Sequence, residues 1–491
     1  MDRHVFARLR ELQIPPAPVC ADHVFLRRVY LDLLGRLPTP DEARAFLDSR
    51  EASKREKLVD QLLSDPQFAE FWARKWLDVL LANQKRLPKE ALVGLHRWWQ
   101  EQLHRGTPFD QVVRELLTAN GHILQNPPAS FFTIHQSAEE AAETTAQVFL
   151  GVRIGCARCH NHPFERWTQE DYYGLAACFA RVERRNDPSF KPARRGPPVQ
   201  VISSRKDGEI LHPITRQPVS PRPLLGKTPW RADDDRRVTL ARWLTASENP
   251  FFARATVNRI WFHLFGRGIV DPPDDFRDTN PPSHEALLDW LARDFVEHRF
   301  DLRHTIRTIC TSATYQLSSE PLPENADDLR FFSRLWPRLL TAEQLLDAVC
   351  QVTEVPETFA EFPATKRAVA LPDSLPIHPF LAAFGQPPRD LPCECERHNE
   401  PNLAQALQLV SGLTLHRKIT AERNRLGRLL ASGASDAAMM EELYLAAFSR
   451  RPSAREAQLV LDTVRNQSNR RAAWEDVLWA ILNSSEFLYR P

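Results

Sequence analysis

The residues best suited to chemistry stand in one five-residue run, Cys156-Ala157-Arg158-Cys159-His160. This C-x-x-C-H spacing is the attachment pattern of c-type haem. Two thiols one helical turn apart can each form a thioether to the porphyrin edge, and the adjacent imidazole is then held at the iron. Each residue type has a separate task, so the pattern is more specific than a bare C-x-x-C. It predicts one haem c, with Cys156 and Cys159 as thioether residues and His160 as the proximal ligand.

The same run is open to a second interpretation, a metal site without haem, and to a third, a purely structural role. Thiolates and imidazoles are the ligands that zinc prefers, and His162 follows closely on His160. A second pair, Cys393 and Cys395, stands two residues apart, so both sulfurs face one side of an extended segment. The two cysteine pairs together would make a four-thiolate zinc site. A local disulfide or two packed thiols is an equal alternative for the second pair.

The choice of a sixth iron ligand is limited because the chain has only three methionines, Met1, Met439 and Met440. Their positions argue against a His/Met pair and leave His/His ligation or an open face. His162 lies too close to His160 to reach the opposite side of the same iron, so a supporting role is expected for it. The candidate distal ligands from other parts of the chain are His263, His135 and His284. A structural histidine is the alternative for each of them.

Composition excludes several classes of function. The chain has 491 residues with Lys+Arg 64 against Asp+Glu 63, and this balance gives no electrostatic reason to expect nucleic acid or an anionic membrane as a partner. No apolar run is long enough for an integral membrane segment, and the first twenty residues lack the apolar core of a secretion signal. No G-x-S-x-G, P-loop, G-x-G-x-x-G or H-E-x-x-H pattern is present, so nothing in the sequence decides for an enzyme.

Helical periodicity dominates the chain, and this predicts the elements that position the cysteine run. Thr39 and Thr168 each precede an acidic residue at the third helical position, which is typical of capped helix starts. A helix over 138–150 is expected to lead into the run, and one over 172–182 to follow it. Further amphipathic helices are expected over 25–34, 54–63, 67–81, 89–103, 109–118, 238–245, 251–265, 285–298 and 303–315.

A proline-rich stretch separates two helical regions. Within it, 199–202 and 209–213 alternate like short strands, and Asp207-Gly208 between them predicts a hairpin turn. The sequence therefore predicts a mostly α protein of two helical domains, 1–182 and 236–491, joined over 183–235 by a Pro-rich linker with a small β-hairpin. A second proline-rich region covers 356–392.

The two ends of the chain contain similar sequence segments. Residues 29–43 match 443–457, and 62–68 resemble 481–487. Each copy has a Tyr-Leu helix, an Arg-x-Pro loop, and a capped helix start with Glu at its third position. A duplicated element is the favoured interpretation, with similar helical hairpins expected in both domains, and a chance recurrence of helix-loop-helix patterns is the alternative.

Several blocks of the chain resemble a known pair of domains. The first set is Phe25–Asp32, Phe149–Val152 with Cys156–Phe164, and Asp171–Leu175. It is similar to the cytochrome-like domain of unknown function that is abundant in planctomycetes. The second set is Val257–Trp261, His263, Phe265–Gly268, Pro282–Leu291, Thr311–Ala313 and Cys393–Arg397. It resembles the planctomycete-specific domain of unknown function that follows the first. The resemblance implies export, often alongside other haem or carbohydrate-associated domains.

The leading functional hypothesis is therefore a single-haem, c-type electron-transfer protein acting with a redox partner protein that the sequence does not identify. A periplasmic or exported location follows from the family and the haem motif. The chain as given carries no signal peptide, and without export a cytoplasmic location is expected. The rival hypothesis is a non-haem metal or structural module that uses the same cysteines and histidines. An enzyme acting on an extracellular polymer has only the family context behind it.

Overall fold

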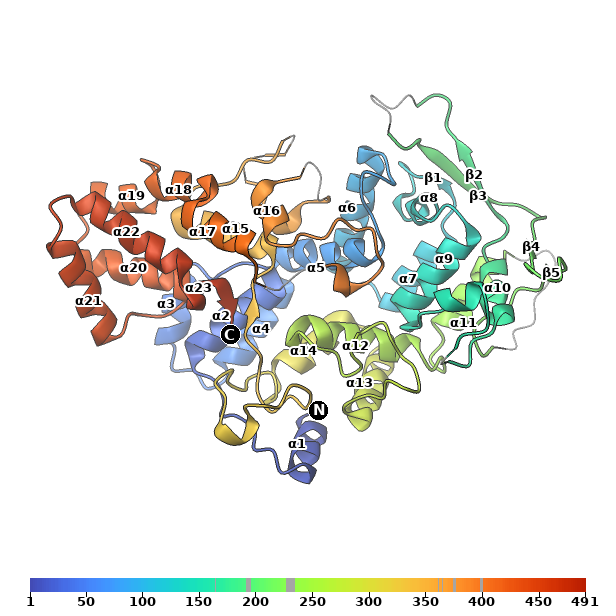
Figure 1. The fold of residues 1–491 in the computed structure, drawn as a ribbon, viewed down its shortest axis with the longest axis horizontal. Coiled ribbons are helices and arrows are strands. Elements are labelled where there is room, and N and C mark those ends of the chain that lie inside the picture. Colours follow the sequence, from blue (N-terminus) through green and yellow to red (C-terminus); the bar gives the residue numbers. More distant parts are fainter. Residues whose placement is uncertain are drawn as a thin grey trace. The chain divides into compact units, whose positions relative to one another are not determined.

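Helices dominate the structure, a computed structural model, and the strands are few and short (Figure 1), so the predicted mostly α fold class is confirmed. The structure describes residues 1–163, 165–190, 196–226, 235–360, 362–363, 365–373, 377–397 and 401–491. Phe164 of the resemblance, parts of the predicted linker and parts of the proline-rich region 356–392 lie outside these ranges. No described helix is long and apolar enough to cross a bilayer.

The element bounds follow the chain in order. The α-helices are α1 Asp2–Glu11, α2 Asp22–Leu34, α3 Pro40–Asp48, α4 Lys54–Ser64, α5 Pro66–Val79, α6 Lys89–Arg105, α7 Phe109–Thr118, α8 Phe131–Ile134, α9 Ala138–Thr145, α10 Gln169–Ala177, α11 Arg236–Leu244, α12 Phe252–Phe265, α13 Glu285–Glu297, α14 Leu302–Cys310, α15 Ala342–Thr353, α16 Pro379–Ala383, α17 Leu403–Ser411, α18 Leu413–Thr420, α19 Arg425–Ala431, α20 Asp436–Phe448, α21 Ala454–Arg465, α22 Arg470–Asn483 and α23 Ser485–Leu488. The strands are β1 Gly121–His122, β2 Val182–Asn186, β3 Gln200–Ser204, β4 Ile210–Leu211, β5 Pro218–Val219, β6 Arg338–Leu339 and β7 Tyr489–Arg490. Short helical turns are η1 Pro127–Ser130, η2 Ala146–Leu150, η3 Gly155–Arg158, η4 Pro323–Asn325, η5 Ala368–Ala370 and η6 Glu394–Glu396.

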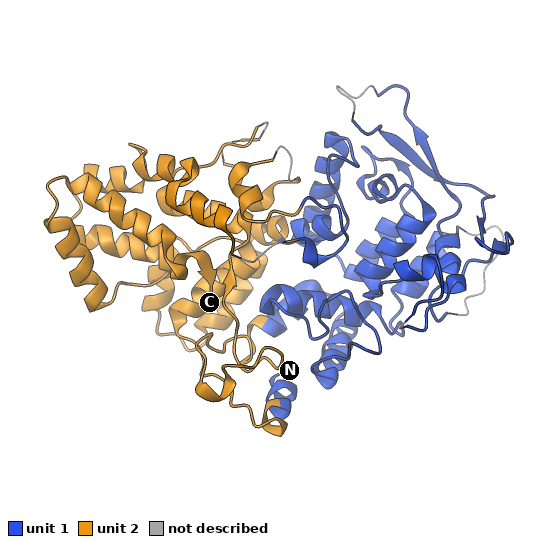
Figure 2. Cartoon of the chain, in the orientation of Figure 1, with its two compact units in different colours: residues 1–8, 72–309, 388–396 blue, residues 9–71, 310–387, 397–491 orange. Residues whose placement is uncertain are grey.

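Two compact units divide the chain (Figure 2). Unit 1 contains residues 1–8, 72–309 and 388–396, and unit 2 contains 9–71, 310–387 and 397–491. Both units are discontinuous in sequence, because each draws on separate stretches of the chain. The predicted domains 1–182, 183–235 and 236–491 are continuous sequence segments and are not the same divisions as these units. They stay a prediction.

Local sequence signals placed several helix ends correctly. Thr39 caps α3 and Thr168 caps α10, each through a reciprocal pair of hydrogen bonds with the acidic residue three positions later. Gly35 and Gly266 end α2 and α12 in the left-handed conformation that favours glycine. These ends depend only on neighbouring residues, so the sequence alone was sufficient to find them.

Three local expectations were wrong. Strands form at both predicted segments, but they do not pair with each other: β3 pairs with β1 and β2, whereas β4 pairs with β5. The helix expected over 172–182 ends at Ala177, and Val182 already begins a strand. The helix expected over 303–315 ends at Cys310, where the Ser312 hydroxyl accepts a hydrogen bond from the Tyr315 amide and so competes with the helical pattern.

The core of unit 1 contains a run of aromatic rings. Trp76 stacks on Trp99 with ring centroids 5.6 Å apart and lies 4.6 Å from Phe109. Phe109 in turn stacks on Phe252 at 5.7 Å. Because all four side chains are buried, this run packs the residues of α5, α6, α7 and α12 into one core.

Unit 2 contains both copies of the sequence repeat, and their local structures match. In the first copy, Arg36 binds both carboxylate oxygens of Glu42 at 2.8 Å, and Glu42 also caps α3. In the second copy, Arg450 binds both oxygens of Glu456 at 2.9 and 2.7 Å, and Glu456 caps α21. The similar hairpins exist as predicted, and both copies belong to unit 2.

Candidate functional site

The cysteine run follows directly on a change of helical geometry in unit 1. Helix α9 is capped by Ser137 and passes at Ala146 into η2, a π-helical turn that ends at Leu150. The run itself begins in the 3₁₀ turn η3, and eight residues separate His160, at its end, from the start of α10 at Gln169. Single π turns inside α-helices are frequent at functional sites.

Gly151 is required at the junction between η2 and the run. Its φ of +68° is a left-handed conformation, and a Cβ there would lie 2.5 Å from the ring of Phe276. The Phe276 amide donates a hydrogen bond to the Gly151 carbonyl at 2.8 Å. A side chain at this position would push away the segment around Phe276, so the close approach of the two segments depends on glycine.

Helix α10 holds the backbone of the run. Gln169 donates from Nε2 to the Arg158 carbonyl at 3.2 Å, and the Tyr173 hydroxyl donates to the same oxygen at 3.0 Å. The Gln169 amide donates to the Asn161 side chain at 3.1 Å. The capped first turn of α10 thereby fixes the position of the residues that the sequence singled out.

The two thiols are free and exposed, whereas Ala157 between them is fully buried and anchors the turn. His160 is exposed as well, and its Nδ1 lies 2.8 Å from the Asn161 carbonyl. A carbonyl oxygen only accepts, so Nδ1 must carry the proton in this hydrogen bond. That tautomer leaves the lone pair of the neutral ring on Nε2, which is the arrangement of a histidine that ligates a metal.

A cavity of about 480 Å³ lies beside the run, in the size range of small-molecule sites. Cys156 and His162 line it, whereas the described lining does not include Cys159 or His160. The apolar part of the wall is Val152, Ile154, Pro163, Trp167 and Phe276. The structure thus brings Cys156 and His162 to one cavity and leaves Cys159 and His160 on the open surface next to it.

Three acidic residues that sequence reasoning missed also line the cavity: Glu143, Glu165 and Asp275. Burial raises the pKa of Glu165, and the negative charge of Asp278 adds to this effect. Its Oε1 atom is buried and has no hydrogen-bond partner in the described part of the chain. Such an atom is costly unless a ligand, ion or water satisfies it, so it indicates an occupant of the cavity.

The wall of the cavity is braced by Asp274, which is 1% exposed. It accepts hydrogen bonds from Gln147 at 2.5 Å and from Arg153 at 2.6 Å. Burial acts to lower the pKa of Arg153, but the hydrogen bond to Asp274 and the negative charge of that carboxylate outweigh it and raise the pKa. The sequence signal that could have found this wall is the run Pro272-Pro273-Asp274-Asp275, where two acidic residues directly follow two prolines.

Cys393 and Cys395 form a disulfide in the structure, with 5.2 Å between their Cα atoms. In this state neither sulfur is available as a thiolate ligand, which corresponds to the disulfide alternative. Glu394 between them is bound by Arg259 at 3.1 Å and lies 3.4 Å from Nε2 of His263. His263 therefore belongs to the surroundings of this disulfide, and it is not part of the described cavity lining.

The two other candidate distal ligands have structural partners. His135 is 1% exposed, packs on Phe131 at 4.5 Å and lies 3.3 Å from the Thr144 hydroxyl. Burial, with smaller contributions from Arg86 and Arg184, lowers the pKa of His135 to about 3. His284 is 5% exposed and precedes α13, with its Nδ1 atom 3.1 Å from the Ser283 hydroxyl.

The cysteine run lacks the convergent ligand atoms of a closed metal site. Within the described ranges, one group of three histidine or carboxylate ligand atoms lies close enough together to share an ion, and it is elsewhere, at Asp294, His298 and His304. The ligand atoms of Cys156, Cys159, His160 and His162 do not converge in this way. Thioether attachment does not require convergence, because the two sulfurs bond to separate carbon atoms of one large group.

Comparison with known proteins gives two family matches. The profile described as PSCyt2, protein of unknown function (DUF1549), matches residues 1–184, and the one described as PSD1, protein of unknown function (DUF1553), matches residues 236–464. Curated proteins and solved structures give no significant match.

The protein is thus a mostly α chain with a PSCyt2 domain of unknown function first and a PSD1 domain of unknown function after it. The predicted resemblance is confirmed, including the order of the two domains: the chain combines PSCyt2 and PSD1.

Proposed function

We propose that the protein is a c-type redox protein that carries one covalently attached haem at Cys156 and Cys159, with His160 as an iron ligand. The observation that carries the proposal is the exposure of both free thiols on one braced turn, followed by an exposed His160 whose Nδ1 hydrogen bond leaves the lone pair on Nε2. Each S–H would add across one vinyl group, with a new S–C bond and the proton on the other vinyl carbon. This addition needs no external oxidant.

The surroundings of the run support a large, partly apolar occupant. Trp167 and Phe276 would contact a porphyrin face or edge, while Arg153 and Arg277 at the same cavity suit the carboxylates that a porphyrin carries. When bound, the iron would supply one-electron chemistry at a potential set by its ligands and burial. The exposed position of Cys159 and His160 would allow electron exchange with a partner protein.

Export belongs to the same proposal, because bacteria normally attach c-type haem outside the cytoplasm. The test is expression behind a secretion leader in a host that matures cytochromes c, followed by peroxidase staining of a denaturing gel. We expect a stained full-length band in wild type and none in the Cys156→Ser/Cys159→Ser variant. Cys350→Ser, at a half-buried thiol of unit 2, is the matched control and should stain like wild type. A colourless wild-type band would end the proposal.

A second candidate function is a non-haem metal site in the same place. The buried, unpartnered oxygen of Glu165 favours it, because Cys156 and His162 border the same cavity. It predicts one zinc ion per chain in protein made without the leader, and loss of that zinc in Cys156→Ser. The two candidates are separated by the stain, which reports covalent haem, and by the zinc that is lost in Cys156→Ser, which reports metal held at this cavity.

A further inference from the structure

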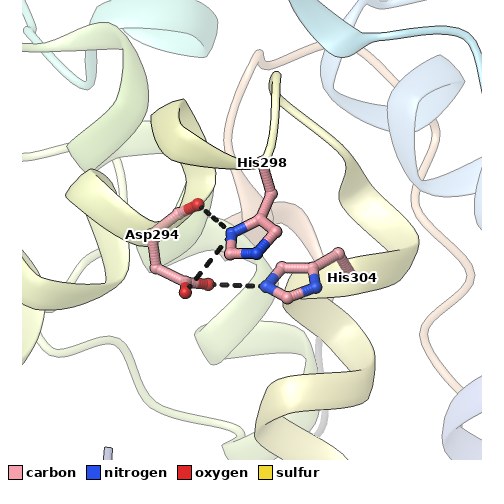
Figure 3. A group of neighbouring side chains, drawn as sticks. All are labelled: Asp294, His298 and His304. Atoms are coloured by element: carbon pink, nitrogen blue, oxygen red, sulfur yellow. Dashed lines mark hydrogen bonds and ion pairs between the residues drawn. The ribbon is translucent and has the colours of Figure 1, made fainter.

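A second cluster of ligand-type side chains lies in unit 1, outside the cysteine run. Asp294 and His298 stand one helical turn apart where α13 ends, and His304 stands in the first turn of α14 (Figure 3). Each of the three offers a ligand atom, and these atoms all lie within 4.8 Å of one another. Two imidazoles and one carboxylate are the donor set of many three-ligand sites for divalent d-block metals.

The ring of His298 is oriented by its own helix. Its Nδ1 atom lies 2.8 Å from the Asp294 main-chain carbonyl, which only accepts, so Nδ1 carries the proton. The lone pair of the neutral ring is then on Nε2. A hydrogen bond from one ring nitrogen to a backbone carbonyl is the usual way in which proteins orient the other nitrogen toward a metal.

His304 is held just as firmly. The Asp301 carboxylate accepts hydrogen bonds from the main-chain amides of Arg303 at 2.8 Å and His304 at 3.2 Å, which fixes the first turn of α14. Nε2 of His304 lies 2.9 Å from Oδ2 of Asp294. A metal ion would replace the single proton shared by this pair, so binding would release a proton.

The spacing is close to that of a bound site. Tetrahedral zinc with bonds of about 2.0–2.1 Å places neighbouring ligand atoms about 3.3 Å apart. The Asp294–His304 pair at 2.9 Å must therefore open by only a few tenths of an ångström. The two imidazole rings are stacked, with centroids 3.6 Å apart and planes 15° from parallel. An imidazole ligates through a lone pair in the plane of its ring, so binding one ion through both rings requires one of these stacked rings to rotate about its side-chain bonds.

Exposure and charge allow an ion to enter. The side chain of His298 is 47% exposed, that of His304 29% and that of Asp294 15%, so the carboxylate lies beneath the two rings. The cationic neighbour Arg303 is turned to another segment, where it donates to the His104 carbonyl at 3.0 Å. The site therefore presents one partly buried carboxylate and two partly exposed imidazole rings to solvent.

We propose that Asp294, His298 and His304 bind one divalent d-block cation of the zinc type, with water completing the coordination. Three protein ligands leave a fourth position open, as in zinc sites that are not closed structural sites. The proposal concerns an ion independent of the cysteine run and does not depend on whether haem is attached there.

The test uses the full chain with Cys156→Ser and Cys159→Ser, so that those thiolates cannot bind the probe. After treatment with a chelator, Co²⁺ is titrated and its visible d–d absorption is followed. We expect one equivalent bound, with no sulfur-to-metal charge-transfer band. His298→Ala and Asp294→Asn should each weaken binding by more than about tenfold, the lower end of the loss caused by outer-sphere changes alone.

The control is His104→Ala in the same background, which removes an exposed histidine of unit 1 and should bind Co²⁺ as before. His298 is half exposed, so its replacement should leave the helical circular dichroism unchanged. If Co²⁺ does not bind, or binds equally well in His298→Ala and Asp294→Asn, the proposal is wrong. A charge-transfer band in the Cys156→Ser/Cys159→Ser background would likewise contradict it, because the ion would then have a sulfur ligand.

Discussion

At the scale of single residues, the histidines of this chain divide by the partner of each ring. His160 and His298 both direct Nδ1 at a main-chain carbonyl, which leaves Nε2 able to ligate a metal. His135 is instead enclosed by Phe131 and Thr144 and has no route to solvent. Residue type alone did not separate these cases, because the distinction depends on which atom each nitrogen contacts.

The burial of His135 predicts a loss of stability in acid. Its pKa is lowered to about 3 in the folded protein and has its ordinary value of about 6.5 in the unfolded chain. Below 6.5 the unfolded chain takes up a proton that the folded protein does not. The stabilising effect of the neutral ring is therefore complete above pH 6.5 and is lost as the pH falls toward 3.

We expect His135→Phe to remove this contribution. The free energy of unfolding of the wild type should fall by about 2 kcal/mol more than that of the variant between pH 7.5 and pH 5, because each pH unit below 6.5 costs about 1.4 kcal/mol. Urea denaturation of wild type and variant at both pH values measures it. His104→Phe, at an exposed position, controls for the loss of a histidine. An unchanged pH dependence in His135→Phe would show that His135 is not the group responsible.

At the scale of elements, the repeated hairpins of unit 2 are held by the same device. A bidentate arginine–glutamate pair joins the loop to the capped start of the next helix in both copies. Arg36 also lies over the ring of Tyr30 at 4.9 Å, and Arg450 over that of Tyr444 at 5.5 Å. The second copy adds a further pair, since Arg450 also binds both oxygens of Glu486 at 2.7 Å.

This geometry predicts that lysine cannot replace either arginine. A point charge cannot make the two parallel hydrogen bonds or the flat stacking contact. We expect Arg36→Lys to lower the free energy of unfolding by about 1 kcal/mol, and Arg450→Lys to lower it further because it has a second carboxylate partner. Thermal and urea denaturation measure both. Arg465→Lys, at a 70% exposed arginine, should change stability by less than about 0.5 kcal/mol. Equal effects of all three substitutions would contradict the prediction.

At the scale of the whole molecule, the sequence predicted what depends on neighbours and missed what depends on distant contacts. The capping of α3 and α10 and the end of α2 at Gly35 were found because the signals lie within a few residues. The pairing of β3 with β1 and β2 was missed, because the partners of a strand are chosen by tertiary packing.

The candidate site shows the same division. The run from Cys156 to His160 was visible as a motif, and its exposure agrees with a role at the surface. The acidic residues that line the cavity could not be predicted, because Glu143 and Asp275 lie 132 residues apart in the sequence and come to one cavity only in the fold. The cluster of Asp294, His298 and His304 was equally hidden, since no cysteine pair accompanies the two histidines and the third ligand lies beyond a tight turn.

A buried ion pair joins segments of unit 2 that are 458 residues apart. Arg490 binds Asp32, with Nε 3.0 Å from Oδ1 and a second contact between Nη2 and Oδ2, and the two side chains are 3% and 5% exposed. The Tyr315 hydroxyl donates to the same carboxylate at 2.6 Å, and Arg338 lies 3.4 Å from it. Burial raises the pKa of Tyr315, with Asp32 adding to the effect, which keeps the phenol protonated as a donor.

Removal of one member of this pair leaves the other charge buried, and that is more costly than replacing both members. We expect Arg490→Met to lower the free energy of unfolding by about 3 kcal/mol, somewhat less than the usual cost of about 3–5 kcal/mol for a fully isolated charge, because Arg338 remains near Asp32. Adding Asp32→Asn should recover part of this loss, with a coupling energy above about 1 kcal/mol in the double-mutant cycle. If the two substitutions were simply additive, the pair would not couple the two distant segments, and the closure of unit 2 would depend on its apolar core alone.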